Sequence, residues 1–341
     1  MRNSFIVSML TVVVLLAVIQ VTLAQTSITP TPAPSKTPTE DPAAEQAEAT
    51  EAVSNASPIT EPWTQDDLQI VTGNVQRPNG IQWFNNQLYT VCNGDSTIYE
   101  VNASTGATRT YIWGVYNAHT LHVETNESGE LNLWIPDFQT NRFLRVDRSG
   151  VQQLSADLSG PWGIELYNET EFLITNLQAN NVIVMTRDGQ TREVVTGLRA
   201  PTGIAADDEN IYVANTGSSR RGIEWISRSQ IADSSTEETQ PLVTGLQNTT
   251  GLDLAADGYL YFAYSLGTRG VVGRVNPDVC IENGGCTNSE IEIVVYTELA
   301  APLAGLTISP DMRLFMHTMF SPDIYWIQLG NEQPEAETES S

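Results

Sequence analysis

Short runs of apolar residues, separated by clusters of polar turn-forming residues, make up most of the chain after residue 62. The segment 200–217 (APTGIAADDENIYVANTG) is typical, because apolar residues flank the acidic and amide cluster 207–210 on both sides. Such clusters favour turns, so the pattern predicts a β-hairpin. A lone hairpin is only marginally stable in water, and it therefore needs partners.

The same hairpin recurs along the chain. Aligned on the glycine near the start of the first strand (Thr120 in the second copy), the copies fall at residues 80, 120, 163, 203, 251 and 305. A third short strand follows each hairpin, and a fourth follows most of them. No helical periodicity of useful length appears after the N-terminal apolar segment. Four short strands in each unit, repeated at this spacing, predict an all-β fold, a six-bladed β-propeller with four-stranded blades.

The last unit has no fourth strand before the chain ends. Residues 68–74 (LQIVTGN) are similar to the fourth strand at 192–198 (REVVTGL). We therefore expect this N-terminal strand to complete the last blade as its outermost strand, which closes the ring and removes the open edges of an array.

The two ends of the chain have a different character. Residues 1–24 contain a long apolar run that ends in small residues, which predicts a signal peptide. An uncleaved membrane anchor is the alternative. Residues 25–62 form a Thr/Pro/Ala/Glu-rich segment that predicts a disordered linker, and 331–341 an acidic disordered tail, so 63–330 remain for the propeller. We expect a secreted or cell-surface protein, extracellular or periplasmic.

Charge and cysteine content narrow the choice of partners. The formal net charge is −25 and the only lysine is Lys36, which argues against nucleic acid and anionic lipid. We expect a monomer, without membrane contact beyond an N-terminal anchor, whose partner is a small molecule or an extracellular protein or carbohydrate. Cys280 and Cys286 bracket a turn sequence and predict a local disulfide, whereas Cys92 has no partner and reads as a buried strand residue.

At the level of motifs, the repeated P-x-G-I/L and L/I-Y-V-x-N/D units resemble the NHL-repeat and SMP-30/gluconolactonase-like six-bladed propellers. The segment 135–147 (IPDFQTNRFLRVD) is similar to the NHL core through Asp137, Asn141 and Arg142. The resemblance covers about 67–330 and implies the propeller fold. It also implies a group that includes lactonases, arylesterases, lyases and non-enzymatic binders. In its lactonases a Glu with Asn and Asp side chains holds a divalent cation in the channel. Asn79 matches that placement. The places where further ligands are expected hold other residues: Trp162, Thr202, Thr250 and Ala304.

In a propeller, the loop that enters the innermost strand and the loop that leaves the second strand lie on the same face, around the channel mouth. These positions supply our ligand-binding candidates: Asn79, Asn93, Asp137, Trp162, Asn176, Asn215 and Tyr264. Four of them could form a carboxylate-poor site for Ca²⁺ or another divalent cation: Asn79, Asp137, Asn176 and Asn215. Alternatively, Asn and Asp end these strands because their side chains bond to the local backbone.

Candidates for acid–base chemistry fall on or near the same channel. They are His119, His317 and Glu165, and two further candidates, His122 and Asp253, lie beside them at the deeper position. We favour a propeller that binds a ligand or protein partner at its channel mouth without catalysis. The alternative is a divalent-metal-dependent hydrolase, lactonase-like or esterase-like, or a lyase that uses the central channel.

Overall fold

The computed structural model describes residues 58–59, 61–217, 222–232, 236–300 and 302–330. The predicted signal peptide and acidic tail, and most of the predicted linker, lie outside these residues. In the part of the chain that is described, no helix has the length and apolar character needed to cross a membrane.

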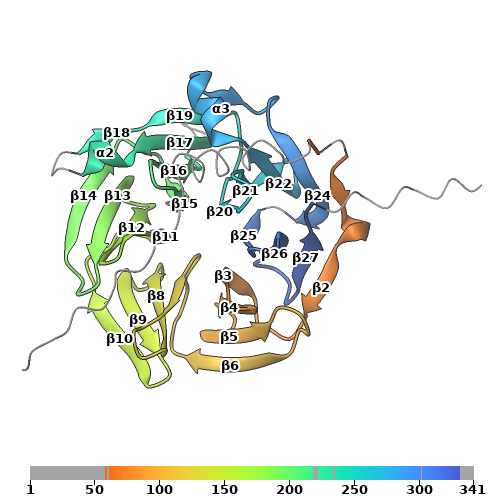
Figure 1. Ribbon diagram of the computed structural model, residues 1–341. Helices are drawn as coiled ribbons and strands as arrows, with labels where there is room; N and C mark the ends of the chain where they lie inside the picture. The colour runs from red at the N-terminus through yellow and green to blue at the C-terminus, as the bar shows by residue number, and fades with distance from the viewer. Residues whose placement is uncertain (1–57, 60, 218–221, 233–235, 301, 331–341) are drawn as a thin grey trace, which may run out of the picture. The chain divides into compact units, whose positions relative to one another are not determined.

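Six antiparallel sheets form a ring around a central axis (Figure 1), which is the predicted six-bladed β-propeller. We number the blades in chain order. Blade 1 contains β3 (Pro78–Phe84), β4 (Gln87–Cys92), β5 (Thr97–Asn102) and β6 (Thr108–Trp113). Blade 2 contains β7 (His122–Thr125), β8 (Leu131–Asp137), β9 (Arg142–Asp147) and β10 (Gly150–Ser155). Blade 3 contains β11 (Pro161–Asn168), β12 (Glu171–Asn176), β13 (Asn181–Thr186) and β14 (Thr191–Thr196).

The second half of the ring repeats this order. Blade 4 contains β15 (Pro201–Ala206), β16 (Asn210–Asn215), β17 (Gly222–Ser227) and β19 (Gln240–Thr244). Blade 5 contains β20 (Leu252–Leu254), β21 (Leu260–Leu266), β22 (Arg269–Val275) and β24 (Glu292–Ala300). Blade 6 contains β25 (Leu303–Ile308), β26 (Arg313–Thr318) and β27 (Ile324–Gln328), together with β2 (Gln69–Thr72) from the N-terminal side of the ring.

The strand β2 is the outermost strand of blade 6 and pairs antiparallel with β27, with Gln69 opposite Trp326 and Ile70 opposite Tyr325. A strand near the N-terminal end of the described propeller and its last strand therefore meet in one sheet. The fourth strand of blade 1, β6, was not identified in the sequence, because its residues show only one fully buried side chain, Tyr111, among exposed ones.

Short additional strands and helical turns lie on the outer rim. Two-residue strands pair in parallel with the outermost strands of three blades: β18 (Glu237–Glu238) with β14, β23 (Cys286–Thr287) with β19, and β1 (Trp63–Thr64) with β24. The helical turns are η1 (Gln65–Asp67), α2 (Arg228–Ile231) and α3 (Pro277–Glu282). The helix α3 begins at a proline, and the side chain of Asn276 caps it by accepting the N–H of Val279.

The core lies between neighbouring blades. The middle strands are buried on both faces, as in β16, where every residue is buried. Each apolar cluster is shared by two blades: Phe143 of blade 2 packs with Phe172 of blade 3, and Leu88 of blade 1 packs with Phe315 of blade 6. Because burial arises at blade–blade contacts, one blade alone has no core, and the six must form together.

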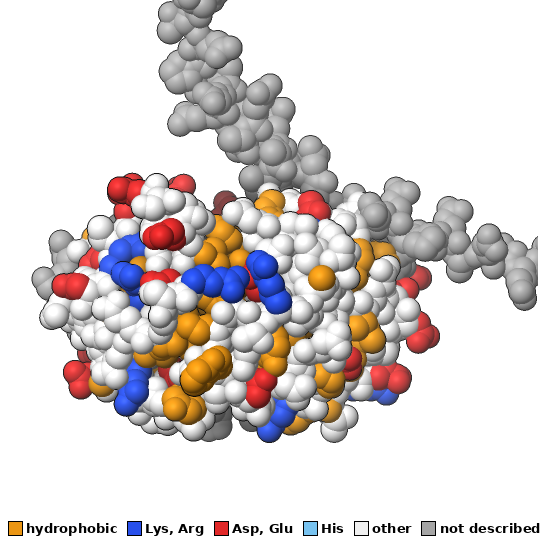
Figure 2. Space-filling view, turned by 90° about the horizontal axis from the view of Figure 1, so that it is seen from below, with side chains coloured by type: hydrophobic (Ala, Val, Ile, Leu, Met, Phe, Trp, Pro, Cys, Tyr) orange, Lys and Arg blue, Asp and Glu red, His pale blue; other side chains and the backbone are white. Residues whose placement is uncertain are grey.

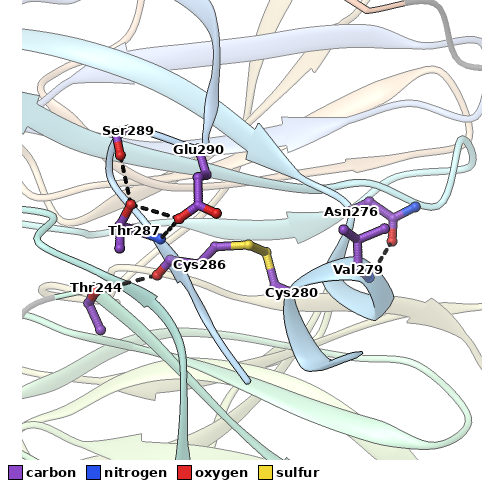
Figure 3. Close-up of a disulfide and its surroundings, with 8 residues drawn as sticks. All are labelled: Thr244, Asn276, Val279, Cys280, Cys286, Thr287, Ser289 and Glu290. Carbon is purple, nitrogen blue, oxygen red and sulfur yellow. Dashed lines mark hydrogen bonds between the residues drawn. A yellow bond between two sulfur atoms is a disulfide. The ribbon is translucent and has the colours of Figure 1, made fainter. Parts of the chain in front are cut away.

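The disulfide between Cys280 and Cys286 joins α3 to β23 on the outer edge of blade 4 (Figure 3). The carbonyl of Cys286 accepts the hydroxyl of Thr244 at 3.3 Å. The neighbouring residue Thr287 is capped by the carboxylate of Glu290, which accepts its N–H at 2.8 Å and its hydroxyl at 2.7 Å. The disulfide therefore closes a rim loop far from the innermost strands.

Candidate functional site on the propeller axis

The innermost strands approach one another very closely around the axis. A Cβ on Gly163 would lie 2.5 Å from the carbonyl oxygen of Thr202, and one on Gly203 would lie 2.8 Å from that of Thr250. These distances exclude any side chain. The repeated glycine is therefore required for packing at the axis and carries no chemistry of its own.

Threonine hydroxyls connect these strands from blade to blade. Thr202 donates to the carbonyl of Thr249 at 2.7 Å, and Thr250 donates to that of Leu303 at 2.7 Å. The hydroxyl of Thr120 likewise donates to the carbonyl of Trp162 at 2.8 Å. The sequence interpretation treated Thr202 and Thr250 as positions where a metal ligand was missing. The structure gives them a positive role, since each hydroxyl satisfies a buried carbonyl of the next blade.

The Asn and Asp side chains at the ends of the second strands hold the entering loops. Asp137, Asn176 and Asn215 each accept a backbone N–H, from Tyr116 at 2.9 Å, from Ser159 at 3.1 Å and from Arg199 at 2.9 Å. Each donor lies four residues before the aligned glycine or threonine of its blade. The same bond is thus repeated in blades 2, 3 and 4.

Both carboxylate oxygens of Asp137 accept hydrogen bonds, because the second oxygen accepts the N–H groups of Gln139 at 3.0 Å and Thr140 at 3.2 Å. These bonds bear on the predicted cation site. Its four members, Asn79, Asp137, Asn176 and Asn215, do not present a common set of unoccupied oxygens, and the described residues contain no cluster of three His, Cys, Asp or Glu side chains suited to a metal ion. The residues present do not fit the divalent cation that the resemblance implied.

In blade 1 the strand-end position belongs to Cys92. Cys92 pairs with Pro78 in the register in which Asn176 pairs with Pro161 and Asn215 with Pro201. The ligand candidate Asn93 lies one residue further along. The thiol of Cys92 accepts the backbone N–H of Gln76, and burial raises its pKa to about 12. Cys92 therefore serves as a loop cap and is an unreactive thiol at neutral pH.

A buried aromatic and polar cluster lies where the chain enters the innermost strands of blades 1 to 3. The ring of His119 stacks on Trp162, with centroids 3.3 Å apart and an angle of 4° between the planes. Phe138 places its edge against both rings, at 5.1 Å and 5.8 Å. Asn79 donates its amide N–H to Asn117. We call these residues, together with His317, the mouth cluster.

Several polar atoms of the mouth cluster are buried without a hydrogen-bond partner. They are Asn79 Oδ1, His119 Nδ1, Trp162 Nε1 and His317 Nε2. Asn79 is 1% exposed, His119 6% and His317 0%. Unpaired buried polar groups are costly and rare, so their concentration here indicates a place for a ligand or ordered water.

Both histidines of the mouth cluster are neutral at physiological pH. Burial, and to a smaller extent the nearby His317, lowers the pKa of His119 to about 3. Burial lowers the pKa of His317 to about 4. Each ring therefore offers one donor and one acceptor nitrogen and no charge. A site of this kind suits an uncharged ligand.

Two carboxyl groups lie deeper along the axis, on β11 and β20. Both Glu165 and Asp253 keep some contact with solvent, yet protein surrounds them. Burial, and to a smaller extent the neighbouring charge of Asp253, raises the pKa of Glu165 to about 8. Burial raises the pKa of Asp253 to about 7. Asp253 accepts the N–H of Ile308 at 2.7 Å, and Glu165 accepts that of Leu166 at 3.0 Å.

Other sequence candidates take different places. His122 lies 3.6 Å from the carboxylate of Glu124, which also accepts Arg187 and the indole N–H of Trp134. Tyr264 packs its ring 5.7 Å from that of Phe262 within an apolar cluster. Two members of the mouth cluster, Asn117 and Phe138, were missed in the sequence. Phe138 directly follows the strand-end Asp137, and this adjacency was the available signal.

Fold and site together define a six-bladed β-propeller with polar and aromatic side chains buried at its axis. No family model matches the chain, and no curated protein matches its sequence. Solved structures do match. A gluconolactonase from Xanthomonas campestris aligns with a TM-score of 0.58 at 13% identity, over 76% of this chain and 88% of its own. A streptogramin B lyase aligns with a TM-score of 0.53 at 15% identity, over 76% and 96%.

A catalytically inactive virginiamycin B lyase from Staphylococcus aureus, solved with quinupristin, aligns with a TM-score of 0.51 at 18% identity, over 74% and 81%. At these identities the likeness establishes the fold. The expected resemblance to SMP-30/gluconolactonase-like propellers is confirmed as a resemblance of fold, and the roles of residues have to be argued from the site itself.

Proposed function

We propose that the protein is a hydrolase or lyase that opens an uncharged ester or lactone on the propeller axis. The observation that carries the proposal is the pair Glu165 and Asp253, whose pKa values of about 8 and about 7 lie near neutral pH. Acid–base catalysis is most efficient when the pKa of the group lies near the operating pH. Strongly shifted carboxyl groups on an axis where solved relatives are lactonases and lyases support this assignment.

The two carboxyl groups can divide the work. In hydrolysis, the ionised member takes a proton from the water that attacks the ester carbonyl, and the protonated member gives its proton to the departing alkoxide. In elimination, the ionised member removes a proton from the carbon next to the alkyl carbon that carries the ester oxygen. A carbon–carbon double bond forms, the bond between that alkyl carbon and the ester oxygen breaks, and the protonated member gives its proton to the released carboxylate.

The mouth cluster binds and orients the substrate in this proposal. With pKa values of about 3 and about 4, His119 and His317 are poor bases at neutral pH, so they act as hydrogen-bonding groups. A neutral imidazole N–H can donate to a carbonyl oxygen and polarise it. Trp162 offers a flat apolar surface for a ring. This refines the sequence interpretation, which considered both histidines as catalytic bases.

The test is turnover of lactone and ester panels by Glu165→Gln and Asp253→Asn, with Asp208→Asn as the matched control because Asp208 is exposed on the β15–β16 turn. We expect each axial variant to reduce kcat/KM by about 100-fold or more and the control to leave it unchanged. The wild-type pH profile should be bell-shaped. Product mass separates hydrolysis, which adds one water, from elimination, which adds none.

A second candidate function is binding without catalysis, favoured by the unpaired polar atoms of the mouth cluster. It predicts that a panel member quenches Trp162 fluorescence and is recovered unchanged. Turnover that survives both Glu165→Gln and Asp253→Asn would contradict the proposed acid–base pair.

A further inference from the structure

Within the described residues, the outer edges of blades 1, 2 and 6 carry no added strand, whereas those of blades 3, 4 and 5 do. A parallel two-residue strand pairs with β14 at 195–196, with β19 at 243–244 and with β24 at 295–296. Within the described ranges, β6 and β10 are the last strands of their sheets. Figure 1 shows both on the outer rim.

The repeat identifies the equivalent position on β6. Ile112 pairs with the third strand of blade 1 at Ile98, as Val195 does at Val182 in blade 3 and Val243 does at Ile223 in blade 4. The pair 112–113 therefore corresponds to the residues that carry an added strand in the other blades. The fold itself shows what this edge accepts: a short extended segment in parallel.

Exposed apolar side chains surround this edge. Trp113 is 76% exposed, Tyr116 47% and Val151 of β10 38%. The Cγ2 of Val151 lies 3.9 Å from the position of a Cβ on Gly114, which places blade 2 beside the end of β6. Figure 2 views this rim and shows apolar side chains gathered next to a row of basic ones. A group of exposed apolar side chains is typical of a binding surface, whereas a single one would not be.

The charge on this rim is opposite to that of the whole chain. Arg109 and Arg148 both pair with Glu100, each at 2.7 Å, and their side chains are 69% and 53% exposed. Two guanidinium groups on one carboxylate leave a surplus positive charge, in a chain whose formal net charge is −25. The guanidinium of Arg148 lies 4.3 Å from the ring centroid of Tyr111, which holds it beside β6.

We propose that the edge of β6 is a docking site for an extended acidic segment of a partner protein. The segment pairs in parallel with residues 112–113, places an apolar side chain on Trp113 and directs carboxylates toward Arg109 and Arg148. One of the chain's own three added strands is acidic, β18 (Glu237–Glu238), and a second, β1, is followed by Asp66 and Asp67. Main-chain bonds at an open edge give affinity, and alternate side chains give specificity.

The test uses a synthetic probe, fluorescein-labelled Glu-Glu-Thr-Val-Thr-Val amide, with Lys-Lys-Thr-Val-Thr-Val amide as the charge-reversed control. We expect the acidic peptide to bind, to weaken as salt is raised, and to slow hydrogen exchange of the β6 amides in 108–113. Trp113→Ala and Arg109→Gln should each weaken binding by about tenfold. In Arg109→Gln, the buried carboxylate of Glu100 still forms its ion pair with Arg148, so we expect the fold to be preserved.

The matched control is Phe320→Ala, since Phe320 is 60% exposed but lies between β26 and β27 of blade 6. It should bind the peptide like the wild type. The proposal is overturned if the acidic peptide does not bind, if the basic peptide binds as well, or if protection appears on another edge. It is equally overturned if light scattering shows a dimer that Trp113→Ala abolishes, because a second copy is then the occupant.

Discussion

At the scale of single residues, polar side chains around the axis mainly form hydrogen bonds with the backbone of the entering loops. In the sequence, the Asn and Asp residues at the strand ends were consistent with two roles. They could form a ring of ligand-binding side chains, or each could accept hydrogen bonds from the nearby backbone. The bonds of Asp137, Asn176 and Asn215 to the entering loops are those of caps. The sequence could not decide between the two, because an amide oxygen is the same chemical group toward a cation and toward a backbone N–H.

Asp137 provides a sharp test of this role. Asp137→Ala leaves three partly buried backbone N–H groups without their acceptor, at Tyr116, Gln139 and Thr140. We expect it to lower the free energy of unfolding by about 3 kcal/mol or more. Urea denaturation measures this, with Asp208→Asn as the control that should change stability by less than about 0.5 kcal/mol. A stable Asp137→Ala protein would contradict the cap.

At the scale of elements, the strands most readily predicted were those buried on both faces. Apolar runs such as 211–213 of β16 identify them directly. The outer strand β6 escaped prediction because most of its side chains face solvent or another blade. Short helices such as α3 are set by a cap and a proline, signals too brief to be read as a helix from periodicity.

The strand β2 should be needed for the stability of the whole ring. A chain that begins at Asn74 loses the outermost strand of blade 6 and exposes the edge of β27. It also loses Leu68 and Trp63, which pack against an apolar cluster shared by blades 5 and 6. We expect the melting temperature to fall by about 10 °C or more. Scanning calorimetry measures it against a chain that begins at Pro58, which keeps β1 and β2. Equal melting temperatures would show that β2 is dispensable for closure.

At the scale of the whole molecule, closure of the ring determines the pKa values of the ionisable side chains near its axis. Glu165 and Asp253 come from blades 3 and 5, and assembly of the blades encloses both carboxyl groups. Burial then favours their protonated forms. The same enclosure keeps His119 and His317 neutral.

Stability should therefore fall as pH rises from 6.5 to 8. Between these values the folded state holds protons on Glu165 and Asp253 that the unfolded state has already released, since their folded pKa values are about 8 and about 7. His119 and His317 act in the opposite direction near pH 6.5, because their ordinary pKa of about 6.5 leaves them partly protonated in the unfolded state, whereas folded pKa values of about 3 and about 4 keep them neutral. This contribution is smaller than that of the two carboxyl groups and disappears as the pH approaches 8.

Chemical denaturation across this pH range measures the trend. Glu165→Gln should flatten the dependence, because a neutral amide replaces the titrating group. Arg109→Gln, on the outer rim, should leave the slope unchanged. A wild-type stability that rises between pH 6.5 and 8 would contradict the enclosed carboxyl pair.

The sequence by itself determined the architecture of this protein. The repeat of short apolar runs and turn clusters requires strands, and the spacing of the copies requires six blades, because each hairpin can bury its apolar faces only against the next. The turn chemistry between Cys280 and Cys286 likewise indicated a local bridge. These features depend on neighbours along the chain.

Only the tertiary structure decided what the polar residues do. It separated Asp137, which the backbone holds, from Glu165 and Asp253, whose carboxyl groups come from different blades and influence each other electrostatically. It also showed that Trp113 remains exposed at a bare edge. The physical reason is that solvation, charge and hydrogen-bond partners at the axis and rim come from other blades, and no local pattern records which residues of distant blades face one another.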